Sequence, residues 1–220
     1  MRSRAFTLVE LLAVVAVIGV LAALLLPAMA KVKLRMQVTQ NLSALRQIQA
    51  ANIVYAADHD GWYVTLVGFD SNGATTSFWY TDQNFRKNYL SIPITGAWPA
   101  NLLSPRSTLR SSTGVRNIAY SYGMNIETLT AGGAYGTPNL VRRVRSTQVS
   151  APAETIALAD AVDWQIDYTD AFQYQGVEVY IPRAMAYRYE GKAGAVFYDG
   201  HAAMLSEADT ADRNLWSIKR

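Results

Sequence analysis

A run of apolar residues near the N-terminus constrains this chain more than any other feature. Residues 5–30 contain one charged residue, Glu10, and the twenty residues 11–30 contain none. That length is what a helix needs to cross a hydrocarbon core of about 30 Å. Fourteen of residues 6–26 are Leu, Ile, Val or Phe. They favour insertion by about 4–8 kcal/mol, against a cost of about 3 kcal/mol for the acidic residue, so the segment is expected to enter a membrane.

The same helix is expected to continue past the apolar run. Apolar residues follow at steps of three and four from 34 to 51, which is typical of an amphipathic helix. Asp60 and Gly61 predict its end, with the glycine in the left-handed conformation. Pro27 lies inside the helix and lacks an N–H, so we expect a bend or a freed carbonyl there.

Three interpretations of the N-terminal segment compete. It could be a plain membrane anchor. It could be a secretory signal peptide, because Arg2 and Arg4 form a basic start and Ala28-Met29-Ala30 resembles a cleavage site. It could be a prepilin-type leader followed by a retained helix. Glu10 interrupts the apolar run, where a signal peptide should be uninterrupted, and the helical pattern continues beyond it. Both details favour the third interpretation.

Residues 4–12, Arg-Ala-Phe-Thr-Leu-Val-Glu-Leu-Leu, resemble the processing and methylation motif of type IV pilins and type II secretion pseudopilins. The resemblance implies that a prepilin peptidase cuts between Ala5 and Phe6 and that the new N-terminus is methylated. It also implies that Glu10 is needed for assembly. Pro27 falls where the family tends to have proline, whereas Ala5 replaces the usual glycine before the cut.

Glu10 has a physical reason to act in assembly. Cleavage would create a charged amine at Phe6, and a carboxylate in a low-dielectric setting gains strongly from such a partner. Within one chain the two groups lie one helical turn apart, and between neighbouring chains the same pair could set the axial register during assembly. The alternative is that Glu10 complements the positive end of the helix at the membrane interface. Positive residues lie on both sides of the span, so charge does not decide its orientation; the resemblance implies a cytoplasmic N-terminus.

The rest of the chain is expected to form one small α+β domain. The sequence has no cysteine, which excludes disulfides, thiolate zinc sites and a cysteine nucleophile. Residues 91–138 are rich in Gly, Pro, Ser and Asn and predict loops. The expected elements are strands at 62–67, 155–159 and 177–181, a hairpin turn at Asn72-Gly73, a short helix near 82–89, and a hairpin of 194–198 with 201–205 around a type I′ turn at Asp199-Gly200.

The C-terminal part resembles a group of bacterial pilin-like proteins with a His followed nine residues later by Asp-Gly. The matching segments are residues 121–125, 152–156 and 191–201. This chain departs from the pattern at two positions. Tyr189 stands where the group has His, and Ser104 stands where many relatives have Cys before proline.

Metal ligands are scarce in this sequence. Asp58, His59 and Asp60 read as a helix cap and turn more readily than as a metal loop. The carboxylates Asp160, Asp163 and Asp199, with His201 nearby, are candidates for calcium, which takes oxygen ligands; turn chemistry is the alternative. No other cofactor is expected.

Catalysis and nucleic-acid binding are not expected. The sequence has no phosphate-binding Gly loop, no Gly-x-Ser-x-Gly and no His-Glu-x-x-His. The formal charge is +3, and the cluster of Arg142, Arg143 and Arg145 reads as a solvated face.

Together these patterns and resemblances predict an α+β, pilin-like fold, with a long N-terminal helix packed on a small antiparallel sheet and a loop-rich insertion. Residues 1–5 would be the leader, 6–30 the transmembrane and filament-core helix, and 31–220 a periplasmic domain that includes the amphipathic half 31–58. The expected function is a structural filament subunit assembled from the inner membrane. Its expected partners are like subunits, the prepilin peptidase and an assembly ATPase platform. The alternative is a secreted or membrane-anchored binding domain, an adhesin or carbohydrate-binding module that exposes Trp62, Trp79, Trp98 and Trp164.

Overall fold

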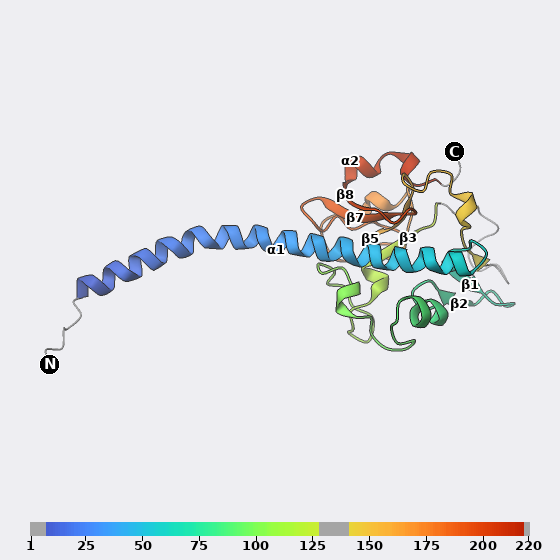
Figure 1. Cartoon of the computed structure of the whole chain (residues 1–220), viewed down its shortest axis with the longest axis horizontal. Coiled ribbons are helices and arrows are strands. Elements are labelled where there is room, and N and C mark those ends of the chain that lie inside the picture. Colours follow the sequence, from blue (N-terminus) through green and yellow to red (C-terminus); the bar gives the residue numbers. More distant parts are fainter. Residues whose placement is uncertain (1–7, 128–140, 218–220) are drawn as a thin grey trace. The chain divides into compact units, whose positions relative to one another are not determined.

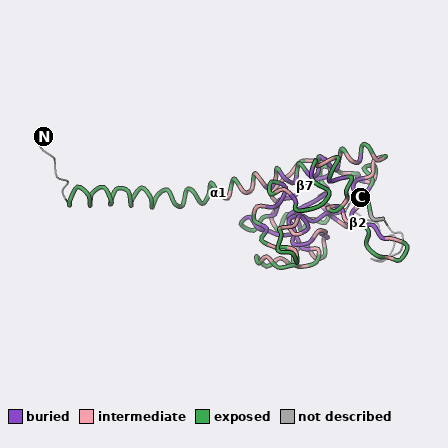
Figure 2. Tube along the Cα trace, turned by 90° about the horizontal axis from the view of Figure 1, so that it is seen from below, coloured by how far each residue is buried: buried purple, intermediate pink, exposed green. Residues whose placement is uncertain are grey.

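Helix α1 runs from Leu8 to Asp58 and is the longest element of the chain (Figure 1). The computed structural model describes residues 8–127 and 141–217. It divides into two compact units, residues 1–37 and 38–220. Helix α1 continues through Pro27 without interruption, so this proline does not end the helix. Every residue from 8 to 33 is exposed, and the buried positions of Figure 2 lie in the second unit.

The end of α1 follows the prediction. Asp60 and Gly61 both have left-handed backbones, with φ of 52° and 81°. The Gly61 N–H donates to the carbonyl of Ala56 at 2.8 Å, which closes the last turn. Asn52, on the buried face of α1, then accepts the N–H of Val64 at 2.9 Å and directs the chain back along the helix.

The larger sheet has five strands in the order β6-β3-β5-β7-β8. Neighbouring strands of this sheet are antiparallel, except that β3 and β6 are parallel. The strand predicted at 155–159 and the predicted C-terminal hairpin are both confirmed. The strands are β3 (Tyr122–Asn125), β5 (Ile156–Asp160), β6 (Gln165–Ile166), β7 (Lys192–Phe197) and β8 (Ala202–Ser206), and the short helix α2 (Glu207–Thr210) follows.

The turn between β7 and β8 is not the predicted type I′. Such a turn needs positive φ at both central residues, and here Gly200 has φ of 94° whereas Asp199 does not have positive φ. The Gly200 N–H donates to the carbonyl of Phe197 at 2.9 Å. The glycine therefore follows a turn whose central residues have negative φ, and it takes the left-handed conformation that rejoins the strands.

The smaller sheet has the order β2-β1-β4, from β1 (Val67–Phe69), β2 (Thr75–Phe78) and β4 (Val141–Arg142). The hairpin predicted at Asn72-Gly73 joins β1 to β2. Asp70 Oδ1 holds it by accepting the N–H of Asn72 at 2.8 Å. The strand predicted at 62–67 is wrong in position, because it begins at Val67. The residues before it bond to α1 and to Val144 instead of a strand.

The core of the second unit lies between α1 and the larger sheet. Leu45 and Ile48 of α1 share one hydrophobic cluster with Leu158 of β5 and Val196 of β7. This confirms the predicted packing of the second half of the helix on a sheet, and the α+β class. Burial of these side chains is the main force that holds the helix to the sheet.

The remaining segments are short turns and loops. The helix predicted near 82–89 is a single π-helical turn, Phe85–Tyr89. The strand predicted at 177–181 is wrong: these residues form no strand, and Val177 is 59% exposed. The alternating pattern was misleading because the charged residue, Glu178, is the one that turns inward. The 3₁₀ turns are Ala100–Leu102, Ile118–Tyr120, Ser146–Gln148, Ala171–Gln173 and Arg213–Leu215.

Candidate functional site

The N-terminal part of α1 presents an apolar surface with no internal partner. Its most apolar window of eighteen residues has a mean hydropathy of 2.9 and contains no buried residue. It is the one helix in the described residues that is long and apolar enough to cross a membrane. The core helix of a soluble protein can be equally apolar, but it would be buried. This surface must therefore be covered by lipid or by other chains.

Glu10 lies in the first turn of α1, between Val9 and Leu11 on the exposed apolar segment. A carboxylate there is well placed to interact with the positive end of the helix or with an amine at the chain start. Ala5 and Phe6 lie outside the described residues, so the predicted cut and the predicted pair stay predictions. The Ala28-Met29-Ala30 segment is helical, in the interior of α1.

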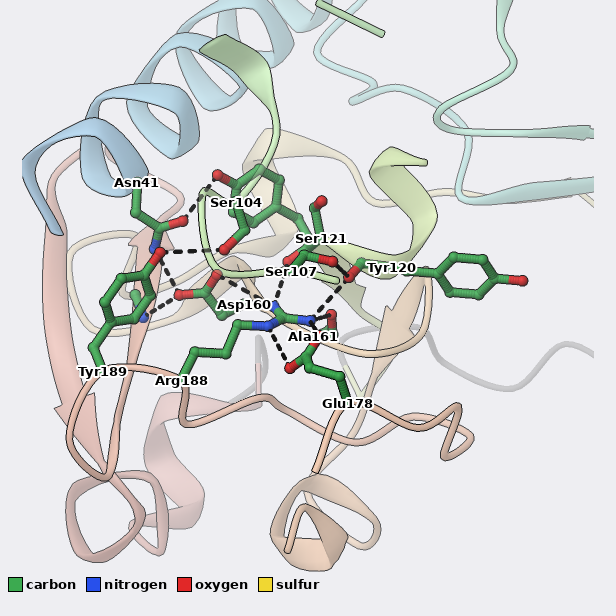
Figure 3. Close-up of polar contacts among 12 residues, drawn as sticks. Asn41, Ser104, Ser107, Tyr120, Ser121, Asp160, Ala161, Glu178, Arg188 and Tyr189 are labelled. Carbon is green, nitrogen blue, oxygen red and sulfur yellow. Dashed lines mark hydrogen bonds and ion pairs between the residues drawn. The ribbon is translucent and has the colours of Figure 1, made fainter. Parts of the chain in front are cut away.

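A buried polar cluster joins α1 to the larger sheet (Figure 3). Its centre is Asp160, at the end of β5, which is completely buried. Asp160 Oδ2 accepts hydrogen bonds from Asn41 Nδ2 at 2.6 Å and from the Gly194 N–H at 2.7 Å. Tyr122 Oη donates to Asn41 Oδ1 at 2.9 Å. Asn41 is thereby bonded directly to β5 and β3, and through Asp160 it is linked to β7.

Arg188 supplies the positive charge of this cluster, and its side chain is 1% exposed. Its Nε and Nη2 atoms donate to the two carboxylate oxygens of Glu178 at 2.8 and 3.0 Å. This is the bidentate geometry in which arginine binds carboxylates best. Arg188 Nη1 lies 3.5 Å from Asp160 Oδ1, a longer and weaker ion pair. The guanidinium also donates to the backbone carbonyls of Tyr120, Ser121 and Ala161.

Two carboxylates thus face one guanidinium, and one of them, Asp160, is completely buried. Burial raises the pKa of Asp160 to about 6, against the lowering effect of Arg188 and of the Gly194 hydrogen bond. Asp160 Oδ1 is buried and makes no hydrogen bond within the described part of the chain. Burial opposes the charge of Arg188, yet Glu178 and Asp160 together raise its pKa. Arg188 therefore stays charged, and Asp160 is the carboxylate that is least stable in its ionised form.

Gly194 is required by the close approach of α1 to β7. A Cβ atom at this position would lie 2.5 Å from Asn41 Nδ2 and 3.0 Å from Asp160 Oδ2. Both atoms are hydrogen-bonded to each other and cannot move aside without breaking that bond. A glycine in β7 is therefore what lets the helix reach Asp160.

The two departures from the C-terminal pattern of the pilin-like group meet in the same cluster. Ser104 Oγ and Tyr189 Oη lie 3.2 Å apart and are both buried. Burial is the main cause that raises the pKa of Tyr189, and the charge of Asp160 adds to it. The C-terminal resemblance stays a prediction. The two residues that depart from its pattern, Tyr189 and Ser104, form one buried hydrogen bond beside Asp160.

Residues 1–26 match the prokaryotic N-terminal methylation motif. This chain carries the type IV pilin signature. The match supports a pilin-like precursor, and the apolar part of α1 fits membrane anchoring. No curated protein and no solved structure matches the chain. The matched residues end within the apolar part of α1, so the match does not extend to the globular unit.

The calcium candidates are engaged in other bonds. Asp160 belongs to the buried cluster. Asp163 accepts the N–H groups of Trp164 and Arg183 at 2.7 and 2.9 Å. Asp199 accepts from the backbone and ring of His201 at 3.0 and 2.7 Å. Among residues 8–127 and 141–217, no group of three His, Cys, Asp or Glu side chains could hold a metal ion. Calcium binding stays an untested prediction.

The tryptophans do not form the exposed patch that the adhesin alternative requires. Trp79 and Trp98 are buried, and Trp62 and Trp164 are half-buried. The guanidinium of Arg143 lies over the ring of Trp62, with its carbon 4.2 Å from the ring centre. The helix-end residues Asp58 and His59 are likewise engaged, with Tyr89 and Tyr55.

Sequence reasoning missed Asn41, Glu178 and Arg188. A signal existed for the first, because Asn41 falls on the buried face of an amphipathic helix where an apolar residue is expected. Arg188 stands in the buried stretch 184–189, and a charge in such a stretch needs a partner. The sequence does not reveal that the partner is Glu178 in an irregular loop.

Proposed function

We propose that this protein is a structural subunit of a type II secretion pseudopilus or of a type IV pilus-like filament. The observation that carries the proposal is the methylation motif at residues 1–26, placed on a helix whose residues 8–33 are all exposed. An apolar helix surface of this kind is stable in lipid and equally stable in a bundle of its own copies. Transfer from lipid to a helical bundle is therefore the natural route of assembly.

The proposed route begins in the inner membrane. The N-terminus lies in the cytoplasm, and residues 31–220 lie in the periplasm. A prepilin peptidase cuts between Ala5 and Phe6 and the new amine is methylated. Like subunits then associate through their apolar helices while an assembly ATPase and its platform supply the work. The globular units coat the filament.

Glu10 has a defined role in this route. When a subunit leaves the membrane pool, its carboxylate pairs with the charged amine of Phe6 on a neighbouring chain. The pair sets the axial register, because an unpaired carboxylate in an apolar bundle costs several kcal/mol. A subunit in the wrong register would leave both charges without a partner.

The first experiment is to determine the N-terminus by mass spectrometry of protein isolated from native membranes. A methylated Phe6 is the expected result. A chain that starts at Lys31 would contradict the proposal in favour of a secreted binding domain. An intact Met1 would contradict it in favour of a plain anchor, with Ala5 as the reason that the peptidase does not cut.

A second experiment tests Glu10 directly. The Glu10→Ala variant is expected to insert into membranes as the parent does and to form no filaments. Insertion is measured by resistance to alkaline extraction, and assembly by electron microscopy of sheared filaments. Glu190→Ala, which removes an exposed carboxylate of the globular unit, is the control and should assemble normally. Normal filaments from Glu10→Ala would show that the register argument is wrong.

A further inference from the structure

A cavity of about 340 Å³ opens among the loops between residues 80 and 117. Its volume lies in the range of about 300–1,000 Å³ that is usual for sites that bind small organic molecules. It lies apart from the buried Asp160 cluster and from α1, since neither contributes to its lining. Its walls include Arg86, Trp98, Ser111, Thr113, Arg116 and Asn117.

Arg86 is a buried cation without a carboxylate partner in the described part of the chain. The residue is 6% exposed, and it follows Phe85 in the π-helical turn. Its Nη2 donates to the Gly96 carbonyl at 3.3 Å, and its guanidinium carbon lies 5.3 Å from the ring centre of Trp98. Its Nε is buried with no hydrogen-bond partner there. Burial lowers the pKa of Arg86, and a buried charge of this kind normally has a counter-charge.

Arg116 brings a second guanidinium to the same cavity. Its Nη2 donates to the carbonyl of Ser104 at 2.5 Å, and its Nε is also buried without a hydrogen-bond partner in residues 8–127 and 141–217. No Asp or Glu is among the residues that line the cavity. Two guanidinium groups that line one cavity with no counter-charge among its walls are an arrangement suited to an anion, and arginine binds carboxylates through two parallel hydrogen bonds.

The other residues that line the cavity indicate which kind of anion it could bind. Ser111 Oγ and Thr113 Oγ1 lie 2.7 Å apart, and Asn117 is held in place by the hydrogen bond from the Ala119 N–H to its Oδ1 at 3.1 Å. These groups match the hydroxyls of a sugar ring. Trp98 and Tyr80 supply an apolar wall for the ring. A small inorganic anion would satisfy the arginines but leave most of the cavity empty.

We propose that this cavity binds an acidic saccharide, a sugar ring that carries a carboxylate, with Arg86 and Arg116 as the carboxylate partners. The proposal does not rest on the filament function, because every contributing residue belongs to the globular unit. If the saccharide site and the filament function are both correct, the subunit binds anionic polysaccharide as well as its own copies.

The test is isothermal titration calorimetry of the full-length protein in detergent with trigalacturonic acid. The same trisaccharide with its carboxylates methyl-esterified is the ligand control. An acidic hexapeptide rich in Glu is the comparison for a protein carboxylate. The acid should bind, and the ester should bind at least tenfold more weakly, since it loses charge-assisted hydrogen bonds.

The protein variants are Arg116→Gln, Arg116→Lys and Arg110→Gln. Arg116→Gln should weaken binding at least tenfold. Arg116→Lys should bind more tightly than Arg116→Gln and more weakly than the parent, because lysine keeps the charge but loses the bidentate geometry. Arg110 is exposed on the same hairpin, where it pairs with Arg116 in a β-bridge, and it does not line the cavity. Arg110→Gln should therefore bind as the parent does.

Near-UV circular dichroism establishes that each variant is folded before it is titrated. If Arg116→Gln is not folded, Arg116→Lys carries the comparison and should still bind more weakly than the parent. Three results would overturn the proposal: no binding of the acid, equal binding of acid and ester, or tighter binding of the acidic peptide. The last would assign the cavity to a carboxylate of another protein.

Discussion

The buried carboxylate of Asp160 makes the stability of the globular unit depend on pH in a defined direction. The pKa of Asp160 is about 6 in the folded chain, above its ordinary value of 3.8. The folded state therefore binds a proton more tightly than the unfolded state. The contribution of Asp160 to the free energy of unfolding is fully present below pH 3.8 and is lost as the pH rises through about 6. Asp160→Asn removes the titration and keeps the size of the side chain.

The magnitude follows from the shift. The pKa rises by about two units, and each unit is worth about 1.4 kcal/mol, so the ionised group lowers the free energy of unfolding by about 3 kcal/mol at neutral pH. The comparison of parent and variant isolates this group, because the buried carboxylates Asp163 and Asp167 titrate in both proteins. Between pH 4 and pH 7 the variant should gain about 2–2.5 kcal/mol of stability relative to the parent, because Asp160 of the unfolded chain is already partly ionised at pH 4.

The assay is urea unfolding of the full-length chain in detergent, followed by tryptophan fluorescence at several pH values between 4 and 7. Trp79 and Trp216 are fully buried and should report the loss of the core. Glu190→Gln, which neutralises an exposed carboxylate, is the control and should follow the parent at every pH. Parallel curves for the parent and Asp160→Asn would refute the argument, because they would show that the ionised Asp160 is not penalised by burial.

Two further substitutions test the same cluster. Gly194→Ala should lower the free energy of unfolding by about 1–3 kcal/mol, because its Cβ would collide with Asn41, and thermal unfolding measures this loss. Gly19→Ala is the control and should cause no loss of stability, because its Cβ would meet no atom within 4 Å and alanine favours a helix. Arg188→Met should lower the free energy of unfolding by about 3–5 kcal/mol, because Glu178 and Asp160 would then be buried without a cation. Urea unfolding at pH 7 measures this change, and a loss below about 1 kcal/mol would contradict the prediction.

The sequence predicts those parts of the fold that depend on local patterns. The apolar run, the amphipathic continuation and the Asp60-Gly61 end define α1, because each is a property of neighbouring residues. The C-terminal hairpin is predictable for the same reason. Its turn type was wrong because Asp199 bonds to His201 and keeps negative φ, leaving Gly200 alone in the left-handed region.

The parts that failed depend on contacts between distant residues. The alternation at 177–181 predicts a strand with valines inward, yet the chain turns Glu178 inward because Arg188 needs a counter-charge. The two arginines that line the cavity, Arg86 and Arg116, are likewise thirty positions apart, and no sequence pattern in either segment predicts that they lie close together. The N-terminal motif was recognisable because its chemistry lies within a few consecutive residues.

The bond between Asn41 and Asp160 joins residues 119 positions apart, and Gly194 completes it from still further along the chain. The helix therefore cannot take its final place while the chain is being made, because its anchoring strands are among the last to emerge. Contacts of such long range slow folding, and they leave apolar surface uncovered in the meantime. The globular unit should pass through a slow, protease-sensitive stage after synthesis, and the time needed to form this one cluster would set how soon a newly made chain is fully folded.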